Sequence, residues 1–195
     1  LAYTAPHWPL HAPEAEIRKY KDRYRMGWDQ LRQERHQRMM KMGIVDERWP
    51  LSPRNPRAPA WKDAPEKGWE AYRMAVYAAQ IDRMDQGIGR ILAELRRSGL
   101  EENTLVLFLS DNGGCAELLK EDGWCEQYGG YTRDRRPIRV GNTPEVLPGP
   151  ADTYMSYDLP WANASNTPFR LYKHWVHEGG IATPLVVSWP AAAAP

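Results

Sequence analysis

The sequence predicts an α/β fold, a mixed and largely parallel sheet flanked by helices, of which this chain forms a partial domain. Three observations support this prediction. A long amphipathic helix is expected at about 69–97, a wholly apolar strand follows at 104–110, and a second strand is expected at 183–189. A long helix that leads into such a strand is typical of half of a β-α-β unit, whose strand lies in a parallel sheet with both faces covered.

The chain has 195 residues, enough for one domain with a substantial core. It starts at Leu1 inside one strand-like stretch and stops just after another. We therefore expect residues 1–195 to be an internal piece of a larger domain.

The charge balance gives no indication of a polyanionic partner. Lys and Arg number 26 and Asp and Glu number 25, a net charge of +1, so nucleic acid is not expected as a partner. No apolar run approaches the roughly 18 residues that cross a bilayer, so no membrane span is expected. The residues do not determine the compartment; for a bacterial protein, periplasm and cytoplasm both stay open.

The N-terminal third combines a turn with a helical segment. Residues 1–13 are interpreted as a strand end that runs into a Pro-His-Trp turn, and residues 14–43 as a helical segment with a break near Gly27. Apolar residues recur there at spacings of three and four, namely Ile17, Tyr20, Tyr24, Trp28 and Leu31. Acidic residues interleave with the arginines, which favours a solvated helical face over a nucleic-acid patch.

The long helix carries an apolar stripe at helical spacing, and Gly99 is expected to cap its C-terminus. The following stretch, "TLVLFLSDNGG", changes abruptly from an apolar strand to Asp111, Asn112 and two glycines.

The region at about 111–170 is interpreted as a loop insertion, because it has no sustained period. Its aromatic residues, Trp124, Tyr128, Tyr131, Tyr154, Tyr157 and Trp161, predict an ordered segment that forms a pocket. Cys115 and Cys125 lie ten residues apart. A disulfide between them is geometrically possible, but two ordinary reduced thiols are the favoured interpretation.

The Asp-Asn pair follows the expected strand directly. Ligands of open α/β sheets bind just outside the carboxyl ends of the strands, and carboxylate and amide oxygens suit Ca²⁺ or Mg²⁺. Gly113 and Gly114 are expected to let the backbone turn with positive φ. From spacing alone, a simple turn is the favoured interpretation, since these are also common turn residues.

Two further segments favour a metal site over a simple turn. His7 lies between prolines in "TAPHWPLHAP", where a stiff chain can present an imidazole in a fixed direction. Lys173 lies in "FRLYKHWVHEGG", next to His174. Together with Asp111 and Asn112, these residues describe an anion site with a divalent cation, a cationic lysine and a proton-donating histidine.

Three segments carry a resemblance to a known family. "YAAQIDRMDQGIGRILAELRRSGLEENTLVLFLSDNGG", "APHWPLHAP" and "NTPFRLYKHWVHEGGIATPL" resemble the sulfatase family of the alkaline phosphatase superfamily, particularly its bacterial arylsulfatases. The resemblance covers 1–190 and implies an alkaline-phosphatase-like catalytic domain that hydrolyses small-molecule sulfate esters. It also implies one Ca²⁺, with Mg²⁺ the less expected ion, and a formylglycine nucleophile made from a C/S-x-P-S-R motif.

The resemblance also assigns roles to single residues. Asp111 and Asn112 match the metal-binding pair, His7 matches the histidine that contacts the sulfate and the leaving-group oxygen, and Lys173 matches the lysine that binds the same sulfate. His174 flanks this lysine and is a candidate substrate contact.

The sequence departs from the family pattern as well. Neither Cys115 nor Cys125 lies in a C-x-P-S-R motif, and the family's early Asp-Asp pair is missing. The chain is therefore expected to carry about half of an active site and to be inactive alone. Two alternatives stay open: a phosphonate or phosphate monoester hydrolase of the same superfamily, and a non-catalytic, metal-stabilised pseudoenzyme.

Overall fold

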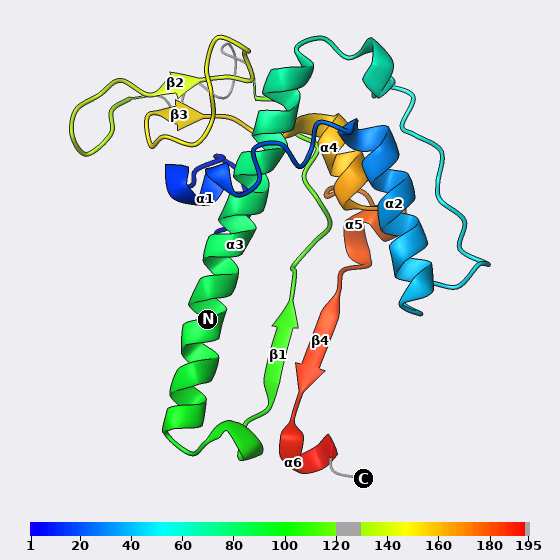
Figure 1. Cartoon of the computed structure of the whole chain (residues 1–195), viewed down its shortest axis with the longest axis vertical. Helices are drawn as coiled ribbons and strands as arrows, with labels where there is room; N and C mark the ends of the chain where they lie inside the picture. Colours follow the sequence, from blue (N-terminus) through cyan, green and yellow to red (C-terminus); the bar gives the residue numbers. More distant parts are fainter. Residues whose placement is uncertain (120–129, 194–195) are drawn as a thin grey trace.

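The computed structural model of the chain describes residues 1–119 and 130–193 (Figure 1). Helix α3 (Lys67–Arg97) runs along one side, and the strands β1 (Val106–Leu109) and β4 (Leu185–Ser188) lie next to each other beside it. Apart from the last one, next to the C-terminus, the shorter helices gather at the upper end of this frame in Figure 1. That end is also where the chain leaves β1 and returns to β4.

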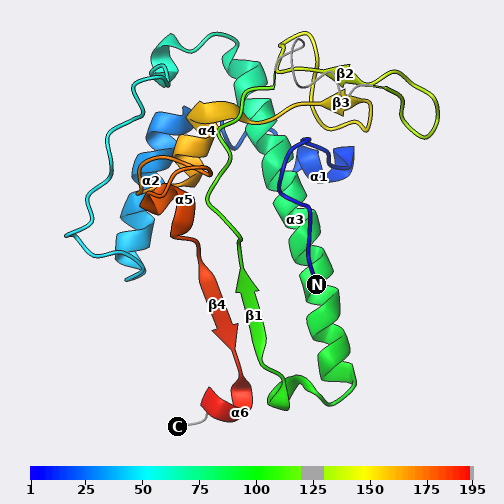
Figure 2. The same ribbon diagram turned by 180° about the vertical axis from the view of Figure 1, so that it is seen from behind.

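The N-terminal segment lies against α3, as Figure 2 shows from behind. It leads into α1 (Glu14–Arg18), which packs on α3 through the buried side chain of Ile17. Helix α2 (Gly27–Lys41) begins at Gly27, whose φ of +81° favours glycine and whose Cα faces the ring of Trp61 in a short 3-10 turn, Trp61–Asp63.

Helix α3 forms because its apolar residues repeat at helical spacing, and its N-terminal half is the part that becomes buried. Ala75, Val76 and Ala79 are fully buried there. The helix is followed by Gly99 at φ +69°, the left-handed residue that commonly stops a helix. A second 3-10 turn, Glu101–Asn103, then carries the chain into β1.

The pairing of β1 differs from the expected parallel arrangement. It pairs antiparallel with β4, with Val106 opposite Ser188 and Leu109 opposite Leu185. Leu107, Phe108 and Val187 are exposed, so both faces of this ribbon are uncovered within the described part of the chain. An apolar run indicates a strand made for burial, but it carries no information about the direction of its partner.

A second small sheet lies within the segment expected to be a loop insertion. Strands β2 (Arg139–Val140) and β3 (Thr153–Tyr154) form a parallel pair of two residues each. Helix α4 (Asp158–Ser165) follows β3, and the short helices α5 (Glu178–Ile181) and α6 (Pro190–Ala193) flank β4. A largely parallel sheet is not seen among residues 1–119 and 130–193.

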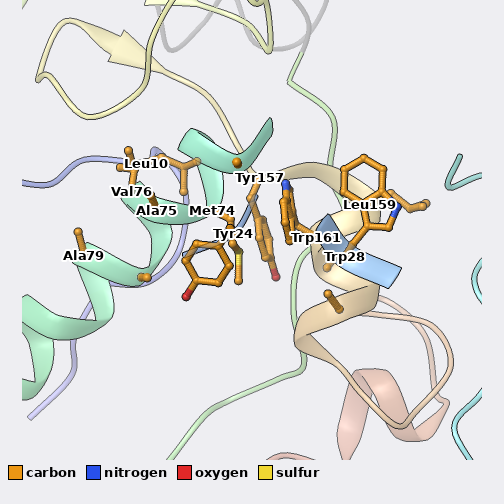
Figure 3. Close-up of a cluster of buried hydrophobic side chains, with 14 of the residues drawn as sticks. Leu10, Tyr24, Trp28, Met74, Ala75, Val76, Ala79, Tyr157, Leu159 and Trp161 are labelled. Atoms are coloured by element: carbon orange, nitrogen blue, oxygen red, sulfur yellow. The ribbon is translucent and has the colours of Figure 1, made fainter. Parts of the chain in front are cut away.

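The hydrophobic core lies between α2, α3 and α4 (Figure 3). The indole of Trp161 is fully buried and meets the rings of Trp28 and Tyr24 edge-on, with centroids 5.3 and 5.9 Å apart. Tyr157 is 4% exposed in the same cluster. The expectation that Tyr157 and Trp161 line a pocket is therefore wrong, because both rings are used to pack α4 against the helices.

A buried ion pair supports this core. The guanidinium of Arg73, which is 1% exposed, donates two hydrogen bonds to the carboxylate of Glu70 and lies 4.1 Å from the Trp69 ring centroid. Burial raises the pKa of Glu70, although Arg73 opposes that change. The indole of Trp161 donates to the same carboxylate at 3.1 Å.

Cys115 is buried and carries a free thiol. Trp124, Cys125 and Tyr128 lie outside the described residues. No helix within the described ranges combines the length and the apolar character needed to span a bilayer.

Candidate active site

His7 and Lys173 meet although 166 positions separate them in the sequence. The Nζ atom of Lys173 lies 3.3 Å from Nε2 of His7. The other ring nitrogen of His7, Nδ1, lies 2.8 Å from the carbonyl oxygen of Trp8 and must donate to it, because a carbonyl only accepts. In the neutral ring, Nε2 is then the acceptor and the lysine ammonium is the donor.

The backbone of Lys173 is tied to the turn that follows β1. Its amide N–H donates to the carbonyl of Gly114 at 3.1 Å. The loop with the lysine and the loop with the Asp-Asn pair are therefore joined directly, and His7 reaches the same place through the lysine side chain.

Asp111 and Asn112 present two oxygen-bearing groups, a carboxylate and an amide, that the described residues leave free. The Asp111 carboxylate is exposed and makes no hydrogen bond or ion pair within the described ranges. Asn112 donates through Nδ2 to the Gly113 carbonyl at 2.9 Å, which leaves its Oδ1 as an unused acceptor. Carboxylate and amide oxygens are hard donors, the type that Ca²⁺ and Mg²⁺ prefer.

These two donors fit part of a calcium site. Ca²⁺ takes about 6–8 oxygen ligands, so a pair cannot complete its coordination. No group of three or more His, Cys, Asp or Glu side chains that could hold a metal occurs in the described part of the chain. The chemistry of the donors matches the ion, and the remaining ligands would come from outside these residues.

The glycines after the pair have a different role from the expected one. The backbone φ of Gly113 and Gly114 lies outside the left-handed region, so the prediction of positive φ is wrong. A Cβ atom on Gly113 would lie 1.8 Å from the carbonyl oxygen of Gly179. The Gly113 N–H also donates to the Gly180 carbonyl at 3.0 Å. Glycine is needed here because two backbones touch.

Asn166 holds the same two loops together from the C-terminal end of α4. Its Oδ1 accepts from the Gly114 N–H at 2.8 Å, and its Nδ2 donates to the carbonyls of Leu171 and Gly179 at 2.9 and 2.8 Å. Sequence reasoning missed this residue, because nothing in "NASNTP" marks one asparagine as different from the other.

Glu117 was also missed. Its Oε2 accepts from the indole N–H of Trp8 at 2.8 Å, and its Oε1 lies 2.8 Å from Nε2 of His174. Burial opposes ionisation of Glu117, but hydrogen bonds from His174, Cys115 and Trp8, with the charge of Lys173, hold its pKa below the usual value. In the sequence, Glu117 resembles any solvated glutamate.

His174 has a left-handed backbone conformation, which a non-glycine residue rarely adopts. Its φ is +80°, a left-handed conformation that costs a non-glycine residue on the order of 1 kcal/mol. The ring is exposed, and the structure places it on Glu117 through Nε2. Its other nitrogen, Nδ1, makes no hydrogen bond with the described residues.

The chain is an α/β protein in which Lys173 and His7 meet beside the turn that follows β1. The backbone of Lys173 contacts Gly114, and Asp111 and Asn112 precede this glycine in the same turn.

The comparisons with known proteins name that class. The family model described as Sulfatase matches residues 1–195, so the chain belongs to the sulfatase family and the resemblance is confirmed. An uncharacterized sulfatase of Schizosaccharomyces pombe is 34% identical over 194 residues, which are 97% of this chain and 34% of the relative. An arylsulfatase of Klebsiella aerogenes is 33% identical over 97% of this chain and 39% of its own length.

A steryl-sulfatase of the mouse is 31% identical over 119 residues, 61% of this chain and 13% of the relative. The chain thus spans between 34 and 39% of the length of the two relatives that it matches almost throughout.

Proposed function

We propose that the protein to which this chain belongs hydrolyses sulfate monoesters, as an arylsulfatase does, and that residues 1–195 are part of its catalytic domain. The observation that carries the proposal is the contact between Lys173 Nζ and His7 Nε2 at 3.3 Å, beside the turn that holds Asp111 and Asn112. Membership of the family and the relative named arylsulfatase support it.

In this proposal Lys173 binds a sulfate oxygen through its ammonium group. The Gly114 carbonyl holds its backbone, and its ammonium group lies against His7. His7 binds the same sulfate and the oxygen of the leaving group. Negative charge builds on that oxygen as the S–O bond breaks, and the Lys173 ammonium group stabilises it by hydrogen bonding. His7 can donate a proton to it only from the protonated ring, because Nε2 of the neutral ring is an acceptor.

His174 is the third proposed substrate contact. Its Nδ1 is free among the described residues, while Nε2 is occupied by Glu117. The ring therefore has one nitrogen left for a substrate oxygen.

Asp111 and Asn112 would hold a Ca²⁺ ion, with Mg²⁺ as the alternative, together with ligands from outside the described residues. When bound, such a cation polarises a sulfuryl oxygen. The nucleophile would be a formylglycine from a C/S-x-P-S-R motif, which this chain does not contain. We therefore propose that the 195 residues alone are inactive.

The wider architecture follows from the same proposal. The exposed apolar faces of β1 and β4 would be covered in the parent protein by further strands and helices of a mixed, largely parallel sheet. The segment at about 111–170 would be an insertion over the carboxyl edge of that sheet.

The test uses the full-length parent protein with p-nitrophenyl sulfate and p-nitrophenyl phosphate as substrates. Lys173→Ala should lower kcat/KM for the sulfate ester by about 10²–10³, the usual cost of one lost charge-stabilising donor. His7→Ala should have a similar effect. Lys41→Ala is the matched control, because Lys41 is exposed at the end of α2.

Each contrary result has a distinct meaning. Preferential turnover of the phosphate ester would replace the proposal with phosphoester hydrolysis. No turnover of either ester by the wild type would point to a non-catalytic protein. Full activity of Lys173→Ala would remove the lysine from the mechanism. Chelation with EDTA should abolish turnover, and added Ca²⁺ should restore it.

A further inference from the structure

We propose that Glu117 is a positioning residue that sets the distance between His7 and Lys173. The proposal rests on the function proposed above. Glu117 does not touch the His7–Lys173 pair in the structure; it contacts the residue that follows each of them.

The carboxylate bridges two segments that are far apart in sequence. Oε2 accepts from the Trp8 indole and Oε1 meets the His174 ring, both at 2.8 Å. Trp8 directly follows His7, and His174 directly follows Lys173. One side chain therefore fixes the neighbours of both members of the pair, which themselves touch at 3.3 Å.

The surroundings keep this bridge in place. The Glu117 side chain is 23% exposed, and the buried thiol of Cys115 lies 3.3 Å from the same Trp8 nitrogen. The ionised carboxylate contacts His174 Nε2 and lies near the charge of Lys173 on one side, and it faces a neutral indole and thiol on the other. A partly buried, charge-assisted hydrogen bond of this kind is stronger than a neutral one.

The geometry argues against a direct role for Glu117 as a base. Both of its oxygens are taken by protein donors, so neither is directed at a substrate proton. It acts instead through backbone continuity, because adjacent Cα atoms are about 3.8 Å apart and a displaced Trp8 or His174 carries its neighbour with it. A misplacement of about 1 Å in an active site costs about 10² in rate.

The test compares Glu117→Gln with Glu102→Gln in the full-length protein. Glu102 is exposed and makes no hydrogen bond or ion pair with the described residues, so it controls for the loss of a carboxylate. Glutamine preserves the shape and can still accept from Trp8, but it lacks the negative charge that faces His174. We expect kcat/KM for p-nitrophenyl sulfate to fall by about 10–100-fold, mainly in kcat, while the variant stays folded at the assay temperature although its melting temperature falls.

A double variant separates positioning from stability. If Glu117 acts through His174, Glu117→Gln in a His174→Gln background should add less than its effect alone. A loss of the same size in both backgrounds, or a loss of activity that is accounted for by unfolding of the variant at the assay temperature, would overturn the proposal.

A readout independent of turnover distinguishes this proposal from the proposed function. The ring ¹⁵N chemical shifts of His174, assigned by their loss in His174→Gln, should change in Glu117→Gln and stay constant in Glu102→Gln. Unchanged shifts would show that the bridge does not form. Changed shifts with unchanged kcat/KM would show that it does not position the pair. If the wild type turned over no sulfate ester, the function would fail while the shifts still reported on the bridge.

Discussion

Replacement of Gly113 by alanine tests whether close backbone contact is the reason for the glycines after the Asp-Asn pair. The new Cβ would lie 1.8 Å from the Gly179 carbonyl oxygen, whereas real contacts of this kind essentially never fall below 3.0 Å. The two loops must therefore separate by about 1.2 Å. That shift strains the hydrogen bonds from Gly113 to Gly180 and from Lys173 to Gly114.

Gly113→Ala should lower the free energy of unfolding by about 3 kcal/mol, because overpacking costs roughly 1–3 kcal/mol and a strained hydrogen bond adds about 1 kcal/mol. For a cooperative unit of about 150–250 residues, this would lower the melting temperature by roughly 6–12 °C, and a larger catalytic domain should show a smaller shift. Calorimetry of the full-length protein measures the shift. The loop shift should also reduce turnover of p-nitrophenyl sulfate, since it moves Lys173.

Gly89→Ala is the matched control. Gly89 lies in α3 with nothing within 4 Å of its added Cβ, so alanine should leave stability unchanged or raise it by up to about 1 kcal/mol. If Gly113→Ala melts at the same temperature as Gly89→Ala, the argument from backbone contact is refuted.

Three further outcomes are expected. Asn166→Ala should lower the free energy of unfolding, measured by chemical denaturation, by about 2–4 kcal/mol, because it removes three hydrogen bonds that join two loops. The control Asn103→Ala should change the free energy of unfolding little, because Asn103 is exposed. Trp161→Ala should lower the free energy of unfolding by about 3–5 kcal/mol, because Trp161 is 0% exposed. Trp175→Ala should lower it much less, because Trp175 is 52% exposed. Equal losses would contradict the placement of the core. The lowered pKa of Glu117 adds stability that is complete above its unfolded pKa and is lost as the pH falls through its folded pKa. Glu117→Gln should therefore flatten the acid side of the stability profile, and an unchanged profile would disprove the pairing.

The sequence by itself determined the family, the long helix and its end. The stripe along α3 and the glycine at 99 are local signals, and the structure shows both. The order of the three motifs along the chain is enough to indicate sulfatases, and the family model agrees. His7, Lys173, Asp111 and Asn112 also stand out in the sequence, because their neighbours are unusual: prolines, glycines and the end of an apolar run.

Tertiary structure alone decided the direction of the β1–β4 pair and the reason for the glycines. Periodicity indicates which face of a segment is suited to burial, but not which segment pairs with it or in which direction. Gly113 and Gly179, which touch, are 66 residues apart, and the sequence around neither glycine indicates the contact.

The same limit explains why Glu117 and Asn166 were missed. Each acts on partners that lie elsewhere in the chain: Glu117 meets Trp8 across 109 positions and Asn166 meets Gly114 across 52. A carboxylate or an amide has the same sequence signature whether it faces water or bridges two loops. Only the fold, which brings residues 7–8, 113–117 and 173–180 to one end of the β1–β4 ribbon, gives these side chains their partners.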